Sequence, residues 1–388
     1  MNKKVAIVSC FWVKNYGSVL QAYATQYKIS KLGIDNETIN YDCTLTGIDK
    51  LKFRLVCMRL KSMWIAKFES IKRKLIYRNR DLINNENVRK KCFDNFIQKN
   101  FILSHKYKDI RELKSKCNSY STFIVGSDQL WLPLNVIIDY YTLNFVPDNI
   151  NKIAYATSFG VSKTPKFLRK RYIHFIKRIN YISVRELSGQ KIVLDLINRN
   201  VPVVCDPTLM LNASDWLTIQ KVEPIIKEKY IFCYFLGKNK KHRDFAKRFK
   251  DFLGVKIVAL IHLDHYVASD ETFADITPYD VAPGDFINLI RHAQYVLTDS
   301  FHGTIFSIIN HKNFFVFNRF SSKQKYSTNS RIDSLLTITN LMDRRLEGDE
   351  NPQILTEKCI NYTDVDTAIG KLRKTTDEFL KKSLYNGR

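Results

Sequence analysis

The sequence has few of the features that mark membrane, secreted or dinucleotide-binding proteins. None of its hydrophobic runs reaches the roughly eighteen uncharged residues of a membrane span, so no transmembrane helix is expected. Its eight cysteines stand singly without a CxxC pair, which predicts free thiols in a reducing compartment. The glycine pattern GxGxxG is missing, so a nicotinamide or flavin cofactor is poorly supported. His262 and His265 have no further ligands at usable spacing, so no metal is expected.

Negative charge is also scarce. There are 38 Asp and Glu against 62 Lys and Arg, which gives a formal net charge of +24. A surface of this sign attracts polyanions such as nucleic acid, anionic lipid or phosphorylated substrates. However, the chain is rich in Asn and Ile, as an AT-rich genome would make it, and such a genome raises the Lys content without any function. No RNA- or DNA-binding module is recognisable, so nucleic acid is not expected as a partner.

Apolar segments with the spacing of strands and helices alternate along the chain. Residues 5–10 predict a buried strand and not a signal peptide, and residues 19–33 predict an amphipathic helix. Further strands are expected at ETINYD, TFIV, KIAYAT, YIS, PVVC, YIFCYF, VKIVALI, YVLT and NFFVF, and further helices at 239–253, 284–292, 303–310 and 364–384. The alternation predicts an α/β protein with two Rossmann-like domains.

The expected domains are unequal in composition. We predict an N-terminal domain over 1–210, a C-terminal domain over 222–350, and a helix within 360–388 that packs back on the N-terminal domain. Residues 47–118 are helical in pattern and carry about twenty Lys and Arg against about seven acidic residues. We therefore predict a basic helical insertion in the first domain, outside both sheets and facing an anionic partner.

Polar turns follow the expected strands, at the edge where open α/β sheets bind ligands. The candidate site residues in and after these turns are Asn15, Tyr16, Gly17, Ser18, Gly126, Ser127, Asp128, Gln129, Trp131, Ser158, Arg185, Glu186, Asp299, Ser300, His302, Gly303, Thr304, Arg319, Lys323 and Arg331. Gly17 and Ser18 could present backbone N–H groups to an anion at a helix start, or form only an ordinary strand–helix turn.

Two of these turns carry charged side chains. Asp128 could act as an acid or base or bind sugar hydroxyls, with Trp131 as an apolar wall, or could only cap the following turn. Arg185 could hold a carboxylate or phosphate by two parallel hydrogen bonds, or could be paired internally with an acid such as Glu186. Asp206, before a proline, is expected only to shape the turn between the domains.

The turn TDSFHGT combines the most chemistry. Asp299 or Ser300 can cap the helix that begins near Gly303, and Thr304 with the first backbone amides would form an anion site. His302 titrates near neutral pH and can give or take a proton, which makes it the main catalytic candidate.

The segments NYGSVLQAYA, FIVGSDQLW, AYATSFG, ISVRELSG, CDPTLML and TDSFHGTIFSIIN, in this order, resemble the polysaccharide pyruvyl transferase family over about 1–340. The resemblance implies two Rossmann-like domains facing a cleft, as in B-type glycosyltransferases, with the active site in the cleft. It implies transfer of pyruvate from phosphoenolpyruvate to a sugar, as a ketal, without a cofactor. The family turn RxHG matches at His302 and Gly303, whereas Ser300 replaces the family arginine.

The implied chemistry needs a proton for the enol methylene, a base for each attacking hydroxyl, and cations for the donor and the departing phosphate. His302 would be the acid or base, Asp128 a second base and Arg185 the anion clamp. The basic stretch 319–331 could take the place of the missing arginine.

The resemblance also implies the protein's partners. The acceptor would be a cell-surface polysaccharide, as in capsule or exopolysaccharide, or its lipid-linked precursor. The protein would then be cytoplasmic, with peripheral contact between residues 47–118 and the inner face of the plasma membrane. A nucleotide-sugar-dependent glycosyltransferase of the same architecture is the alternative, because fold alone does not separate the two.

Overall fold

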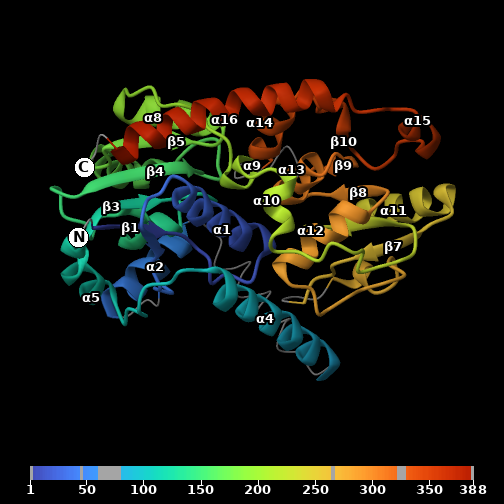
Figure 1. Ribbon diagram of the computed structural model, residues 1–388, viewed down its shortest axis with the longest axis horizontal. Coiled ribbons are helices and arrows are strands. Elements are labelled where there is room, and N and C mark those ends of the chain that lie inside the picture. Colours follow the sequence, from blue (N-terminus) through green and yellow to red (C-terminus); the bar gives the residue numbers. More distant parts are fainter. Residues whose placement is uncertain (1–2, 44–46, 60–79, 264–266, 321–328, 386–388) are drawn as a thin grey trace.

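The protein is built around two parallel β-sheets, one in each half of the chain (Figure 1). The structure, a computed structural model, describes residues 3–43, 47–59, 80–263, 267–320 and 329–385. The first sheet contains β1 (Lys4–Val8), β2 (Asn36–Thr38), β3 (Tyr120–Val125), β4 (Asn151–Thr157) and β5 (Tyr181–Val184). The second contains β6 (Tyr230–Tyr234), β7 (Lys256–Ala259), β8 (Tyr295–Thr298), β9 (Asn313–Phe317) and β10 (Arg345–Leu346).

Helices connect the strands and cover the sheets. In the first half they are α1 (Tyr16–Lys31), α2 (Gly47–Arg59), α4 (Arg80–Asn100), α5 (Ile110–Ser115), α6 (Asp139–Thr142), α7 (Arg169–Lys177), α8 (Leu187–Ile197), α9 (Pro207–Met210) and α10 (Ala213–Leu217). In the second half they are α11 (Lys240–Leu253), α12 (Pro283–His292), α13 (Phe301–Ile309), α14 (Ser330–Ile338), α15 (Pro352–Thr356) and α16 (Tyr362–Tyr385).

The central strands are continuous apolar runs because helices cover both faces of each sheet. Every residue of β6 is buried, as are Phe123, Ile124 and Val125 of β3. Their side chains alternate between two apolar clusters on opposite faces, such as Phe123 in one and Ile124 in the other. The prediction of an α/β protein with two Rossmann-like units is confirmed.

The strand orders create a switch point in each sheet. The order is β2-β1-β3-β4-β5 in the first sheet and β10-β9-β8-β6-β7 in the second. In the first sheet the chain passes from β1 to β2 on one side and then to β3 on the other side of β1. In the second sheet it passes from β6 to β7 on one side and then to β8 on the other side of β6. A crevice opens at such points beyond the carboxyl ends of the strands, where α/β proteins bind ligands.

The described helices of the basic block lie outside both sheets, as predicted. α2, α4 and α5 lie along one side of the molecule, the lower side in Figure 1. α4 is more than a surface helix, because Phe93, Phe96 and Ile97 are buried in a cluster that also contains residues of the second half. α16 runs back over the first half, where Leu380 and Leu384 pack in the same cluster as Val5.

The two halves share an apolar core. Tyr16 of α1 stacks on Phe286 of α12 with ring centroids 4.8 Å apart, and its hydroxyl donates to the carbonyl of Val281 at 3.0 Å. Contacts of this kind fix the relative position of the two sheets. They therefore also fix the distance between side chains that leave the two sheet edges.

One expected strand is wrong. PVVC pairs with β5 only through an isolated bridge between Val203 and Val184. Pro202 has no N–H to donate to a ladder, and Asp206 begins the next helix as its N-cap, so pairing stops after one bridge. No helix in the described parts of the chain combines the length and apolar character that a bilayer crossing requires.

Candidate functional site

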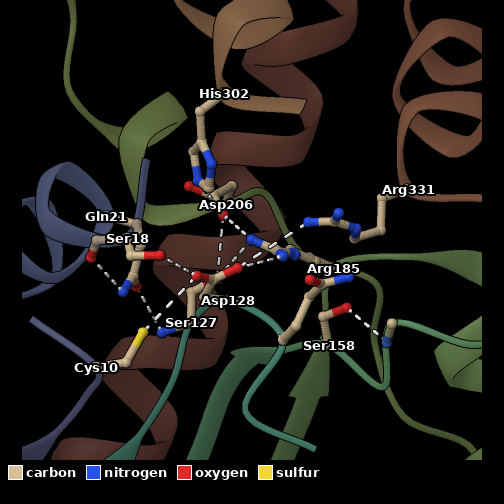
Figure 2. A network of polar contacts seen from close by, with 12 residues as sticks. Cys10, Ser18, Gln21, Ser127, Asp128, Ser158, Arg185, Asp206, His302 and Arg331 are labelled. Carbon is tan, nitrogen blue, oxygen red and sulfur yellow. Dashed lines mark hydrogen bonds and ion pairs between the residues drawn. The ribbon is translucent and has the colours of Figure 1, made fainter. Parts of the chain in front are cut away.

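Turns from both sheets meet in one buried polar network (Figure 2). Asp128 and Arg185 follow β3 and β5 of the first sheet, and Asp206 lies just before α9. His302, in the first turn of α13, and Arg331, in the first turn of α14, approach from the second half. Turns from both sheets therefore contribute to a single site, including Asp128 and His302, which lie more than 170 residues apart in the sequence.

The turn after β3 is shaped to present Asp128. Gly126 has φ 142, and a Cβ there would lie 1.9 Å from the carbonyl oxygen of Tyr155, so only glycine fits. Asp128 itself has a left-handed φ of 67, which turns its carboxylate toward α1 and Arg185. One carboxylate oxygen accepts from the Ser18 hydroxyl at 2.6 Å, and the other from Arg185 at 3.1 Å.

Arg185 is paired internally with acidic side chains. Its side chain is 1% exposed, and its Nη1 donates to Asp206 at 2.6 Å while Nη2 donates to Asp128. Glu186 Oε2 lies 3.8 Å from its Nε, and the Phe301 ring lies 4.7 Å beneath the guanidinium carbon. Of the two roles expected for Arg185, the geometry matches the internal ion pair, because carboxylates accept from both of its terminal nitrogens and Glu186 lies at ion-pair distance from Nε.

Asp206 is the residue that sequence reasoning placed outside the site. Its Oδ1 accepts from the backbone N–H and hydroxyl of Thr208 at 3.0 and 2.6 Å, as a helix cap does. Its Oδ2 faces the network, where it accepts from Arg185 and from the Ser127 hydroxyl at 3.1 Å and lies 3.7 Å from Nε2 of His302. The feature of the sequence that could have included Asp206 in the site is its position at the same sheet edge as the other candidate turns.

His302 is buried, not exposed at the edge of the cleft. Its ring packs on Gly17, where a Cβ would lie 2.0 Å from Nδ1, so the absence of a side chain at residue 17 makes room for the imidazole. Its Nε2 has no hydrogen-bond partner within the described parts of the chain, although Asp206 lies at ion-pair distance. The imidazole is therefore oriented by an acid and keeps capacity for one more contact.

Electrostatics keep the two aspartates ionised. Burial alone would raise the pKa of Asp128, but the charges of Arg185, His302 and Arg331 outweigh it and lower that pKa to about 2. The pKa of Asp206 is likewise held well below its usual range, against the effect of burial, by His302 and Arg185. A carboxylate of such low pKa is a weak proton acceptor near neutral pH, so Asp128 suits charge stabilisation better than the base role expected for it.

Arg331 is the cation of the network with the least complete pairing. Its guanidinium lies 4.0 Å from Asp128 and stacks over Phe301 at 5.4 Å. Burial, followed by repulsion from Arg185, lowers the pKa of Arg331 to about 10, so it remains charged at neutral pH. Gln129, with its amide oxygen turned toward it, accepts from Arg331 at 3.1 and 3.3 Å.

Other predicted residues support the turns. Glu186 accepts from the Ser158 hydroxyl at 2.8 Å and from the backbone N–H of Phe159, and burial raises its pKa. Asp299 accepts from the amides of Leu236 and Gly237 at 2.6 and 2.8 Å, and so fixes the end of β6.

The helix starts are already capped. Ser300 is the N-cap of α13 and accepts from the N–H of Gly303 at 3.2 Å, while the Thr304 hydroxyl donates to the carbonyl of Ser300. At α1, Asn15 accepts from the N–H of Ser18 at 3.2 Å. These contacts use donors that were expected to meet an anion, so side-chain cations are the better anion contacts here.

Two predicted residues lie away from the network, and a third falls outside the described part of the chain. Trp131 is fully buried among Phe159 and Phe175, and its indole donates to the carbonyl of Tyr141, so it is no wall of the cleft. Tyr16 belongs to the shared core described above. Lys323 falls outside the described residues.

A cavity of about 260 Å³ lies between the halves and is lined by Asn15 and Tyr16, the two residues before Gly17. Arg89 of α4 lines it and donates to the carbonyls of Ile261 and Pro278. Its other walls include Lys14, Lys90, His262 and Arg319. Arg319 makes no hydrogen bond or ion pair with the described part of the chain and only stacks on Phe320, so its charge is open to a ligand.

No cluster of three or more His, Cys, Asp or Glu side chains that could hold a metal ion occurs among residues whose positions are described. His262, one of the two histidines noted in the sequence, instead contacts Asp270 through Nδ1 at 2.7 Å.

Comparison with known proteins places this geometry in context. The sequence profile for polysaccharide pyruvyl transferases matches residues 15–322. No curated protein sequence matches. A putative UDP-N-acetylglucosamine 2-epimerase from Listeria monocytogenes is similar in structure, with a TM-score of 0.53 and 10% identity over 100% of this chain and 98% of that chain. S. aureus MnaA, in a co-structure with UDP, has a TM-score of 0.50 and 11% identity over 99% and 97%. At such identity the likeness concerns the fold alone.

Proposed function

Because the chain belongs to the polysaccharide pyruvyl transferase family, we propose that it transfers pyruvate from phosphoenolpyruvate to a sugar of a cell-surface polysaccharide or its lipid-linked precursor. One observation carries the proposal. His302, in the matching part of the family turn, lies beside Asp206, which Arg185 links to Asp128, where the edges of the two sheets face each other.

The reaction balances without an oxidant or a cofactor. A proton added to the methylene of phosphoenolpyruvate makes it a methyl group and leaves an electron-poor carbon bearing the phosphate. One sugar hydroxyl attacks this carbon, the C–O bond to phosphate breaks, and a second hydroxyl closes the ketal. Of the two hydroxyl protons, one replaces the proton used on the methylene and the other leaves with the phosphate.

His302 is the proposed proton donor to the methylene and acceptor from a hydroxyl. Its Nε2 lies 3.7 Å from Asp206, whose carboxylate orients the ring. Asp128 stays anionic and stabilises positive charge as it develops at the reacting carbon. Arg185 positions both aspartates and does not bind the donor.

Arg331 and Arg319 are the proposed contacts of the donor's phosphate and carboxylate. Ser300 stands in the place of the family arginine, and Arg331 lies over the ring of Phe301, the next residue. Arg319 brings an unpaired guanidinium to the neighbouring cavity, and the cavity is large enough for a donor of this size. Two guanidinium groups on an anion with two charged ends give a stronger hold than either alone.

The experiment is a donor panel read by thermal shift. Phosphoenolpyruvate should raise the melting temperature with increasing occupancy, by about 2.7 kcal/mol of stability at a hundredfold excess over Kd. Arg331→Met should weaken the shift, while Lys166→Met, at an exposed position of the short 3-10 helix before α7, is the matched control. A shift with a nucleotide sugar but none with phosphoenolpyruvate would instead support the glycosyltransferase alternative, and a shift with oligonucleotide alone would support neither.

A further inference from the structure

Helix α2 in the basic block has an apolar face turned outward. Phe53, Val56 and Cys57 face the protein, with Cys57 buried and the other two half-buried. Leu51, Leu55 and Met58 lie on the other side, where 59%, 49% and 49% of their surfaces are exposed. The helix is thus apolar on both faces, and only one of the faces is covered.

The three exposed side chains form one stripe. At about 100° per residue, Leu55 lies about 40° to one side of Leu51 and Met58 about 20° to the other. Lys52 and Arg54 lie about 100° and 60° from Leu51 on opposite sides, so cationic side chains border the stripe. Single exposed leucines are common on protein surfaces, but a stripe of three with basic borders combines the two features that an anionic membrane interface binds, apolar side chains and cations.

We propose that the outward stripe of α2, Leu51, Leu55 and Met58, enters the interfacial region of an anionic lipid bilayer. Its bordering cations would meet the lipid headgroups while the three apolar side chains leave water. About twenty Lys and Arg against about seven acidic residues in 47–118 supply attraction over a wider surface.

Other occupants fit the stripe less well. A second copy of the chain would bring together two surfaces of a protein whose formal net charge is +24, so like charges would oppose the contact. A nucleic acid would pair with the cations but leave the three apolar side chains in water. A bilayer with anionic headgroups satisfies both the charge and the apolar surface.

The proposed function supplies only the biological purpose of membrane binding by α2. A sugar acceptor linked to a membrane lipid is confined to the bilayer surface, and an enzyme held there by α2 would meet it in two dimensions. The physical claim about α2 stands or falls separately from the identity of the donor.

The test is flotation of the full chain with vesicles of phosphatidylcholine alone or with phosphatidylglycerol. Binding should require the anionic lipid and weaken at high salt. The variant Leu51→Gln/Leu55→Gln/Met58→Gln keeps good helix formers and should lose about tenfold or more in binding. The matched control Val222→Gln/Ile354→Gln changes side chains that are 67% and 56% exposed elsewhere, and should bind as the wild type does.

Three results would overturn the proposal. These are equal binding of wild type and the triple variant, equal binding to neutral and anionic vesicles, and self-association in solution that the triple variant abolishes. The phosphoenolpyruvate-induced thermal shift is measured on the same samples. A shift retained in the triple variant separates loss of membrane binding from loss of the donor site, and a shift missing from every sample counts against the proposed function alone.

Discussion

The two sides of the interdomain site carry their charges in different ways. On the side of the first sheet, Arg185 is buried and bonded to Asp128 and Asp206, so charge is met almost completely within the protein. On the side of the second sheet, Arg319 makes no ion pair in the described part of the chain, although the charge of Asp299 is near enough to interact with it, and Nε2 of His302 has no hydrogen bond there. A cation that is paired within the protein can hold geometry, whereas a cation without an ion pair can take a ligand.

This difference assigns separate tasks to the two halves. The first half provides a framework for the site in which the buried cation is paired with acidic side chains. In the mechanism proposed above, the second half would provide the proton-transfer group and the cations that hold the donor. Four changes to the protein test whether the two halves differ in this way.

Arg185→Met should be the most damaging change. It leaves Asp128 and Asp206 buried without their shared cation, and breaking such a pair costs about 3–5 kcal/mol of unfolding free energy. Urea unfolding measures the loss. Arg319→Met is the matched control on the other side and should cost little, since Arg319 makes no ion pair with the described residues. Equal losses for both variants would show that the two sides are not different in the way proposed.

His302→Gln should lower turnover by about a hundredfold or more, the usual scale for loss of a general acid or base. Glutamine keeps much of the side-chain volume above Gly17, so the melting temperature should fall by no more than a few degrees. His302→Ala opens a cavity in a buried position and should also reduce stability. Initial rates of phosphate release, measured alongside melting curves, separate the two effects. Full turnover in His302→Gln would remove the histidine from the mechanism.

The dependence of stability on acid pH should show how much the charge of Asp128 contributes. A carboxyl with a lowered folded pKa of about 2 contributes stability above its unfolded pKa, and this contribution is lost as pH falls toward the folded value. Between about pH 5 and pH 2 the wild type should therefore lose about 2 kcal/mol more than Asp128→Asn. Asp299 differs, because burial raises its pKa and its contribution instead decreases as pH rises. Parallel pH profiles for wild type and Asp128→Asn would contradict the assignment.

Gly17→Ala should disturb His302 without removing a polar group. Its Cβ would need the space of the imidazole, 2.0 Å away, so the ring must move and turnover should fall by about tenfold. Gly370→Ala in α16 is the control, since a Cβ there meets nothing within 4 Å. That variant should gain about 0.5–1 kcal/mol of stability and keep full turnover. A Gly17 variant as active as the Gly370 variant would mean that the ring position is not critical.

Much of the architecture could be predicted from local patterns. The segment NFFVF forms β9 over the expected residues, and the expected terminal helix lies within α16. Apolar runs and helical spacing are local properties, and the packing of the sheets agrees with them. Open α/β sheets bind ligands beyond the carboxyl ends of their strands, and this rule alone was enough to select the turns that meet in the site.

The side chains that meet in the site could not be predicted in the same way. Trp131 looked like a cleft wall beside Asp128 in the sequence, yet adjacent residues on the turn face different surroundings, and the indole lies in the core. Asp206 was expected only to shape a turn. The sequence does not reveal its bond to Arg185, because the two side chains meet only when β5 and α9 are packed together.

The amino-acid sequence by itself determined the two α/β units, the basic block and the set of polar turns, since each depends on residues close together in the chain. Only the tertiary structure decided which charges are paired. Arg185 became a positioning residue and Arg331 the more open cation because packing sets the distances from each to Asp128, at 3.1 and 4.0 Å. Coulombic and hydrogen-bond energies change steeply over such distances, and residues far apart in sequence acquire them only when both sheets are assembled.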